Sequence, residues 1–395
     1  MRAIAAANPK SFTHLLLLIT LATLGLTAQQ AWTQGSVPSG YRFVQFDAPG
    51  SGTVPYSGTE AVSINSRGAT TGYVVDNSYG THGFVRNPDG TVVVFDPPGA
   101  DPVIGGTYPV GINGRGVIAG GFGDSYAVYH GFLRNPDGTF TVFDAPGVSP
   151  GVGNYLGTQP QSINARGEIA GIYEGADFVG HGFLRAPDGK ITVFDDPAEG
   201  VGSYQGTWAY GINDKGEISG AVTDPAGGSH GFVRSAKGDY TDFDFPGETS
   251  TAFNSALINN QGVTAGYYAT PTGFVAGYER SAEGLVTTFV PAVSAGATAV
   301  WTFGLAADGT TLGRVVDANS VGHAFIRSPG GKTVVFDVSK PVSNPNGWGS
   351  ELWGKNEEGV IVGQFIDAGF VDHSFLLIHN SGCRPVKSCR SEKTE

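Results

Sequence analysis

Residues 164–195 read NARGEIAGIYEGADFVGHGFLRAPDGKITVFD, and this stretch holds three marks that return along the chain. The first mark is Asn-x-x-Gly, the second is His-Gly-Phe-(Val/Leu)-Arg, and the third is Phe-Asp. A degenerate copy of the first mark keeps only its glycine, Gly309. The seven copies begin at Asn65, Asn113, Asn164, Asn213, Asn259, Ala306 and Asn356. Successive copies are 46 to 51 residues apart, a period typical of solenoids and propellers.

Each repeat can be interpreted as four short β-strands. A strand that ends at Asn is followed by a β-like run such as 168–173, then by the His strand and by the strand that ends at Phe-Asp. Pro-Asp-Gly separates the last two, as at 187–189, and its glycine supplies the backbone conformation that a hairpin turn requires. Four strands of about five residues with their turns fill one repeat, which is the size of a propeller blade.

The order of the marks at the two ends predicts how the last repeat is completed. The first Phe-Asp strand, 41–47, has no His strand before it, and the last His strand, near 374–377, has no Phe-Asp strand after it. If the N-terminal strand completes the last blade, the ring has no unpaired edge. We therefore predict an all-β fold, a seven-bladed β-propeller of four-stranded blades over residues 40–380, closed in this way. A right-handed β-helix is the alternative.

The N-terminal segment has the pattern of a secretory signal. Arg2 and Lys10 precede an apolar run at 15–26, and small residues follow it. This run is too short to span a bilayer as a stable helix. We expect a signal peptide over residues 1–28 and a linker over 29–39. The mature protein is then secreted, extracellular or periplasmic, with no membrane insertion.

The two cysteines, Cys383 and Cys389, both lie in the C-terminal tail, residues 381–395. In an oxidising compartment they are expected to close a small disulfide loop. Their spacing suits neither a zinc site nor a redox Cys-x-x-Cys motif.

The charge balance excludes one class of partner. The sequence has 35 acidic and 23 basic residues, a formal net charge of −12. Such a surface repels phosphate backbones, so we predict no nucleic-acid partner.

These motifs carry a family resemblance. Asn-x-x-Gly-x-(Ile/Val)-x-Gly followed by His-(Gly/Ala)-Phe resembles the extracellular repeat family named HAF, whose His-Ala-Phe core stands at 323–325. The resemblance covers about 41–377, although most copies carry Gly where the family name has Ala. It implies a β-propeller on a bacterial secreted protein and brings no common catalytic activity.

Residues that recur in every copy are expected to serve construction. The turn glycine, Gly68 in the first copy, fits a left-handed turn position, and the glycine four residues on, Gly72, is expected to let neighbouring blades approach. The repeat histidines, about fifty residues apart, are too far apart in the chain to share one metal unless all reach the axis. We expect each imidazole to bond backbone or the Asp of the Phe-Asp strand instead.

No catalytic residue, metal site or cofactor is predicted. Gly227–Gly231 matches the Gly-x-Ser-x-Gly nucleophile elbow, but it stands at the entry to a His strand, whereas the elbow needs a strand-to-helix turn. The repeated aspartates are expected to tie turns. Calcium binding by the loop aspartates Asp76, Asp124, Asp317 and Asp367 is left open.

One variable column is the predicted ligand-binding site. It stands five residues before each Asn position, and its residues are Glu60, Tyr108, Gln159, Trp208, Asn254, Trp301 and Glu351. The first four copies precede it with an unchanged Gly-Thr. If this strand is innermost, the seven residues ring an axial opening, where aromatic faces and hydrogen-bonding groups suit a sugar or another polar ligand.

Three function classes follow from this column. The first is a secreted, non-catalytic recognition or scaffold protein that binds an extracellular glycan or a cell-surface component at the loop face. The second is a structural or adhesion protein that acts through protein contacts. The third is a polysaccharide hydrolase or lyase, for which Glu60 and Glu351 are the one pair of carboxylates in the column. The oligomeric state of the protein is not predicted.

Overall fold

The computed structural model describes residues 37–148, 156–175, 177–245, 252–270, 272–340, 342–344 and 346–380, with the side chains of 252–255 excepted. The signal peptide, most of the linker, Cys383 and Cys389 lie outside these ranges, so those predictions stay predictions. The described residues form 28 strands and no α-helix. Nothing in them is helical, long and apolar enough to cross a membrane.

The strands pair antiparallel in consecutive sets of four, named here a to d in chain order. The first four sets are β2 (Gly58–Ile64), β3 (Thr70–Val75), β4 (Thr81–Arg86) and β5 (Val92–Phe95); β6 (Thr107–Ile112), β7 (Ile118–Gly123), β8 (Tyr129–Arg134) and β9 (Phe140–Phe143); β10 (Gly157–Ile163), β11 (Ile169–Glu174), β12 (Gly180–Arg185) and β13 (Ile191–Phe194); β14 (Gly206–Ile212), β15 (Ile218–Thr223), β16 (Ser229–Arg234) and β17 (Tyr240–Phe243). The next two are β18 (Ala252–Ile258), β19 (Thr264–Ala269), β20 (Val275–Arg280) and β21 (Val286–Phe289); β22 (Ala297–Leu305), β23 (Thr311–Asp317), β24 (Gly322–Arg327) and β25 (Thr333–Phe336).

The last set combines both ends of the described chain. It consists of β26 (Ser350–Lys355), β27 (Ile361–Ile366), β28 (Asp372–His379) and, as its fourth strand, β1 (Tyr41–Phe46). β1 pairs antiparallel with β28 over its whole length, from Tyr41 opposite His379 to Phe46 opposite Ser374. This is the pairing that the order of the sequence marks predicts.

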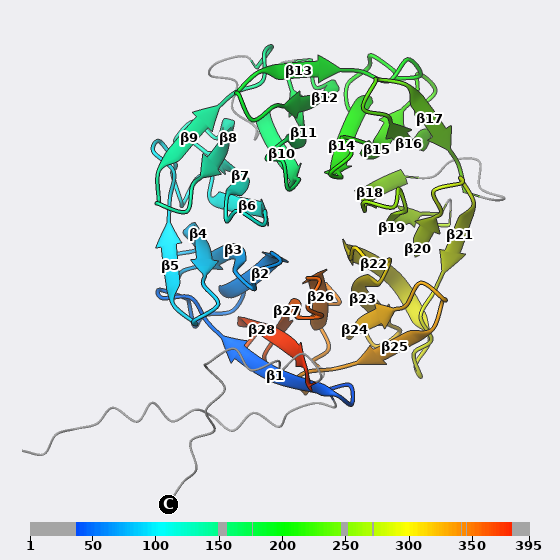
Figure 1. Ribbon diagram of the computed structural model, residues 1–395. Helices are drawn as coiled ribbons and strands as arrows, with labels where there is room; N and C mark the ends of the chain where they lie inside the picture. The colour runs from blue at the N-terminus through cyan, green and yellow to red at the C-terminus, as the bar shows by residue number, and fades with distance from the viewer. Residues whose placement is uncertain are drawn as a thin grey trace, which may run out of the picture. The chain divides into compact units, whose positions relative to one another are not determined.

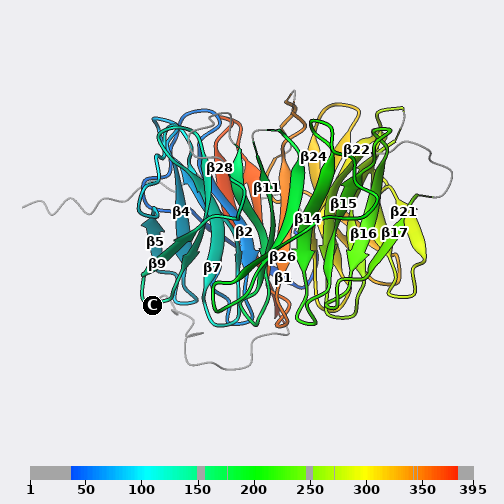
Figure 2. The same cartoon turned by 90° about the horizontal axis from the view of Figure 1, so that it is seen from above.

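The a strands lie innermost. Figure 1 shows β2, β6, β10, β14, β18, β22 and β26 around a common centre, with the d strands at the outside. Seen from the side, the strands run between two faces (Figure 2). Because the strands alternate in direction, the d-to-a and b-to-c connections share one face, and the Asn-x-x-Gly and Pro-Asp-Gly turns share the other.

The core lies between neighbouring sets and is built from the repeat's own residues. The phenylalanine of the His strand is fully buried at Phe84, Phe132, Phe183, Phe232, Phe325 and Phe375. Burying an aromatic side chain is worth about 1.5–3 kcal/mol, so this position stabilises each set. The cluster that contains Ala61 and Phe84 of the first set also contains Val362 and Leu376 of the last.

The repeat arginine joins one set to the next. Arg134 places its guanidinium 4.9 Å from the ring centre of Phe95, which ends the d strand of the preceding set. The same contact joins Arg86 to Phe46 of β1, also at 4.9 Å. Desolvated contacts of this type contribute on the order of 1–2 kcal/mol each. The Arg and Phe marks of the sequence are therefore halves of one interaction.

The second repeated glycine is explained differently from the prediction. A Cβ on Gly72 would lie 1.9 Å from the carbonyl oxygen of Glu60, and one on Gly120 would lie 2.4 Å from that of Tyr108. Both oxygens belong to strand a of the same set. The expectation of a contact between blades is therefore wrong. A bulge in strand a, between Ala61 and Ser63 in the first set, accompanies this close approach.

Candidate functional site

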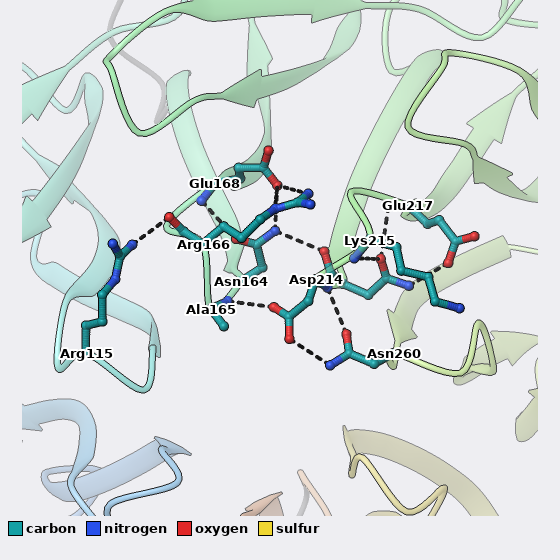
Figure 3. Close-up of polar contacts among 10 residues, drawn as sticks. Arg115, Asn164, Ala165, Arg166, Glu168, Asp214, Lys215, Glu217 and Asn260 are labelled. Carbon is teal, nitrogen blue, oxygen red and sulfur yellow. Dashed lines mark hydrogen bonds and ion pairs between the residues drawn. The ribbon is translucent and has the colours of Figure 1, made fainter.

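The Asn-x-x-Gly turns form a chain of asparagine contacts on the tight-turn face. Asn65 accepts hydrogen bonds at Oδ1 from the backbone N–H groups of Arg67 and Ala69, which fixes its own turn. Its Nδ2 donates to the carbonyl of Asn113 in the next set, at 3.0 Å. Figure 3 shows the same arrangement around Asn164, which also contacts Glu168. These asparagines therefore serve construction, as their recurrence indicates.

The contact chain extends from the last set to the first and is altered at one place. Asn356 donates from Nδ2 to the carbonyl of Asn65, at 3.1 Å. Ala306 has no amide to donate, and between its set and the last one Lys355 instead binds Asp308 and Thr310. A cavity of about 640 Å³ opens beside this altered turn.

The repeat histidines bond the Asp of strand d, which confirms the prediction. Nδ1 of His130 lies 2.9 Å from Asp144, and Nδ1 of His373 lies 3.0 Å from Asp47, which follows β1. The hydrogen bond to Asp144 raises the pKa of His130. The other four pairs are His82–Asp96, His181–Asp195, His230–Asp244 and His323–Asp337.

The loop aspartates tie their turns. Oδ1 of Asp76 accepts the backbone N–H groups of Ser78 and Gly80, and these bonds lower the pKa of Asp76. Asp124, Asp317 and Asp367 accept equivalent bonds. The turn role is thus confirmed, while calcium binding stays untested. Among the described side chains, His181, Asp195 and Glu199 bring three ligand-type atoms within 4.8 Å of one another, but two of these residues already form the His–Asp pair.

The residues of the variable column fall into two groups. Hydrogen bonds and ring contacts connect Glu60, Trp301 and Glu351, and Tyr108 joins them through Tyr73, whose ring centre is 5.4 Å away. Trp208 packs instead toward Gly180 and a core cluster of the fourth and fifth sets. Gln159 of β10 stands opposite Ile172 of β11. The side chain of Asn254 lies outside the described residues.

A cavity of about 270 Å³ stands at the first group. Its walls come from β2 and β3 of the first set, β22 and β23 of the sixth, and β26 to β28 of the last. The lining residues are Glu60, Tyr73, Phe303, Arg314, Trp348, Gly349, Glu351, Trp353, Gln364 and Asp372. Carboxyl, amide and guanidinium groups therefore share one small space with four aromatic side chains.

A continuous hydrogen-bond network runs along one wall of this cavity. The Tyr73 hydroxyl donates to Glu60 Oε2 at 2.6 Å, and Gln364 Nε2 donates to the same oxygen at 3.0 Å. Gln364 Nε2 also donates to Glu351 Oε1 at 2.6 Å, and Arg314 contacts Glu351 Oε2 at 3.1 Å. Charge-assisted bonds of this kind hold their members more firmly than neutral ones, so the wall is preorganised.

Burial controls the ionisation of the acids in the cavity. Burial raises the pKa of Glu60, although the hydrogen bonds from Tyr73 and Gln364 oppose the shift. Burial, together with the carboxylates of Glu60 and Glu351, raises the pKa of Asp372 to about 9. At neutral pH Asp372 is therefore a neutral carboxylic acid in this cavity.

The aromatic residues are held by contacts with one another. Phe303 and Trp353 stack with ring centres 4.4 Å apart, and Trp348 meets Tyr56 edge-on at 5.5 Å. Arg314 lies over the Trp301 ring at 4.7 Å. One face of Trp301 is thus already covered, and Trp301 does not line the cavity.

Sequence reasoning did not find Tyr73, Arg314, Gln364, Trp353 or Asp372. The first three each follow the second repeated glycine directly and stand opposite Glu60, Trp301 and Glu351 in their hairpins. Their column is variable as well: Tyr73, Gly121, Ile172, Ala221, Tyr267, Arg314 and Gln364. The variation of this column between repeats is the sequence feature that could have identified these three residues as site candidates.

The match to a nucleophile elbow at Gly227–Gly231 lies at the entry to a His strand, as predicted, and not at a strand-to-helix turn. Ser229 is the first residue of β16, and no helix follows it. His230 bonds Asp244 as the other repeat histidines bond their partners.

Comparisons with known proteins support the fold alone. No protein-family model and no curated protein matches the sequence. Solved structures that align over most of this chain include the following three. Virginiamycin B lyase from Staphylococcus aureus has a TM-score of 0.55 at 13% identity, covering 86% of this chain and 99% of that one. A streptogramin B lyase has 0.53 at 12%, covering 85% and 98%. The BP39L lectin from Burkholderia pseudomallei has 0.52 at 10%, covering 83% and 98%. All three are β-propeller proteins, so this chain has a propeller-like all-β fold.

Proposed function

We propose that the chain is a secreted, non-catalytic recognition protein that binds a glycan in the cavity between Glu60 and Trp353. The observation that carries this proposal is the gathering of carboxyl, amide and aromatic groups in one preorganised cavity. Sugars bind such sites through hydroxyl hydrogen bonds to the polar groups and through stacking on the rings. The cavity volume of about 270 Å³ lies just below the ~300–1,000 Å³ of ligand pockets, which suits one sugar residue.

The proposal includes a seven-bladed ring in which β1 completes the last blade. Support comes from the β1–β28 pairing within the last set and from two contacts between the first and last sets, the Arg86–Phe46 contact and the bond from Asn356 to Asn65. The ring matters for function because the cavity takes its walls from both the first and the last set.

Secretion rests on the N-terminal segment and on the resemblance to HAF repeats. Residues 1–28 carry the basic, apolar and small-residue order of a signal peptide. A secreted protein meets extracellular glycans and cell-surface components, which is where a recognition protein of this type acts.

A hydrolase role for Glu60 and Glu351 is not favoured. Both carboxylates accept a hydrogen bond from the same nitrogen atom, Gln364 Nε2. Paired acids of glycoside hydrolases stand on opposite sides of the scissile bond, roughly 5–10 Å apart. The Gln364 amide thus holds both carboxylates together in the absence of a substrate, which is not the arrangement of an acid and a nucleophile on either side of a bond.

A glycan array with three proteins tests the proposal. The wild type is compared with Trp348→Ala, which removes a wall of the cavity, and with Trp208→Ala, which removes an aromatic of the variable column outside it. We expect binding by the wild type, loss of at least tenfold in Trp348→Ala, and little change in Trp208→Ala. Equal loss in both variants would favour the complete ring of column residues over the cavity. The absence of glycan binding by folded wild type would reject the proposal and favour protein partners.

A further inference from the structure

The cavity contains polar groups that have no partner within the described protein. Asp372 is 8% exposed, lines the cavity, and its carboxyl group has no hydrogen bond or ion pair with any described residue. Gln364 is 4% exposed, and its Oε1 is buried without a partner while its Nε2 makes two bonds. Leaving a buried polar group unpaired destabilises the folded state, so a native structure seldom keeps several at one place without a use.

The backbone fixes Asp372 in this position. Its N–H donates to the carbonyl of Ser57 at 2.9 Å, and it forms the parallel bridge to Gly58. A Cβ on Gly58 would lie 2.1 Å from the carbonyl oxygen of Asp372, so the glycine is needed for this approach. The carboxyl group therefore cannot leave the cavity by a small backbone shift.

Asp372 is also an exception within the repeat. It stands directly before the His position of its set. The corresponding residues of the other sets are Thr81, Tyr129, Gly180, Ser229, Val275 and Gly322, none of which carries a charge. The chain has thus placed an acid at this position in the one set where the position lines the cavity.

The acidic groups that line the cavity outnumber the basic ones. Three carboxyl groups, those of Glu60, Glu351 and Asp372, face one guanidinium, that of Arg314, which is already paired with Glu351. Tyr73 from β3 and Asp367 from the loop before β28 add no positive charge. A cation is the group that this cavity lacks.

We propose that the cavity binds the protonated primary amine of an amino sugar, with Asp372 as its counter-ion. The inference rests on the proposed glycan-binding function and adds the chemical class of the sugar. An ammonium group has three N–H donors, which can bond the carboxyl oxygens of Asp372 and Glu60, both of which line the cavity. The aromatic ring of Trp348, which also lines the cavity, adds cation–π attraction.

Binding of the amine is coupled to release of a proton. In the free protein Asp372 holds its proton because burial and the neighbouring carboxylates of Glu60 and Glu351 disfavour its charge. When the ammonium enters, the Asp372 O–H bond breaks, the proton passes to solvent, and the carboxylate pairs with the cation. One proton leaves for each ligand bound. Affinity therefore rises with pH until the amine of the ligand begins to lose its own proton.

The test compares a glucosamine trimer with its fully N-acetylated form, since acetylation removes the charge. Isothermal titration calorimetry is run on the wild type, on Asp372→Asn, and on Asp224→Asn. The last replaces an aspartate by its amide in a loop outside the cavity. We expect the wild type and Asp224→Asn to prefer the glucosamine trimer at least tenfold and Asp372→Asn to lose this preference. Repeating the titration in two buffers of different ionisation enthalpy should show about one proton released by the wild type and none by Asp372→Asn.

The outcomes separate this inference from the proposed function. Equal affinity of the wild type for both trimers, or a preference that survives Asp372→Asn, overturns the amine assignment even if a neutral glycan binds and is lost in Trp348→Ala. If no glycan binds, n-propylamine and n-propanol serve as probes in thermal-shift titrations. Stabilisation by the amine alone that is lost in Asp372→Asn supports the ammonium site without the glycan function. No stabilisation of the wild type by propylamine, with neither trimer bound, rejects both.

Discussion

The sector from β6 to β17 and the sector that joins β22–β28 to β2 and β3 share one construction but differ toward the centre. Both have the asparagine contacts, the His–Asp pairs and the buried phenylalanine of the His strand. After the second repeated glycine, the first sector carries Gly121, Ile172 and Ala221, whereas the second carries Tyr73, Arg314 and Gln364.

This difference shows where the repeat can change without loss of the fold. Construction bonds are made at the turns and between the outer strands, so the inner positions of strands a and b are free to vary. In the first sector the strand-b position holds a small or apolar residue, Gly121, Ile172 or Ala221. In the second they hold charged and hydrogen-bonding groups that build a cavity. The proposed function thus rests on one sector of an otherwise uniform scaffold.

The largest effect is expected from a test of how firmly β1 belongs to its set. Phe43 of β1 contacts Phe375 and Phe365, with ring centres 5.4 and 6.2 Å apart, and Phe140 holds the corresponding place in β9. Each is half-buried, so Phe43→Ala and Phe140→Ala should each lower the free energy of unfolding by about 2–4 kcal/mol. Urea denaturation measures both. A much smaller loss for Phe43→Ala would mean that β1 does not complete the ring.

The asparagine contacts come next, and the chain offers the reverse substitution as a control. Asn65→Ala removes three buried hydrogen bonds and should cost about 2–3 kcal/mol. Ala306→Asn introduces the missing amide at the altered turn and should gain up to about 1 kcal/mol. The denaturation midpoints of the two variants show whether each substitution lowers or raises the free energy of unfolding. Destabilisation by Ala306→Asn would show that the Lys355 contacts have replaced the amide bond fully.

The ionisation of Asp372 predicts how stability depends on pH. Its pKa is raised to about 9 in the folded protein, from about 3.9 in an unfolded chain. The folded state then binds more protons between these values, so stability falls as pH rises through this range, by up to about 1.4 kcal/mol per pH unit. Asp372→Asn should flatten the decline of the melting temperature between pH 6 and 9. Asp188→Asn, at an exposed turn where the new amide oxygen can accept the same backbone N–H of Lys190, should leave it unchanged. An unaltered slope in Asp372→Asn would contradict the assignment.

The smallest effect is expected from a repeat histidine. The hydrogen bond to Asp144 raises the pKa of His130, so its stabilisation is complete below about 6.5 and is lost as pH rises through the folded-state value. His130→Gln should therefore cost about 1 kcal/mol at pH 5.5 and less at pH 9. Thermal melts at the two pH values measure this. The fifth set carries Ala276 at the same position, so the fold tolerates loss of the pair.

Much of the fold could be predicted because the residues of each repeat specify its own turns, side-chain pairs and strand order. Turn glycines, the His–Asp pairing and the four-strand order were all readable from single repeats, and the order of marks at the ends predicted that β1 pairs with β28. The site was predicted only in part. Glu60 and Glu351 were found in a variable column, but Trp208 of the same column packs toward the core.

The sequence by itself determined the strands, their grouping and the residues that join one set to the next, because these depend on hydrogen bonds and turns repeated about every fifty residues. Only the tertiary structure decided which variable residues meet. Glu60 and Glu351 are almost three hundred residues apart, and they share one amide because the last set stands beside the first. The pKa of Asp372 is raised for the same reason. Its burial and its neighbouring carboxylates come from strands that no local sequence pattern connects.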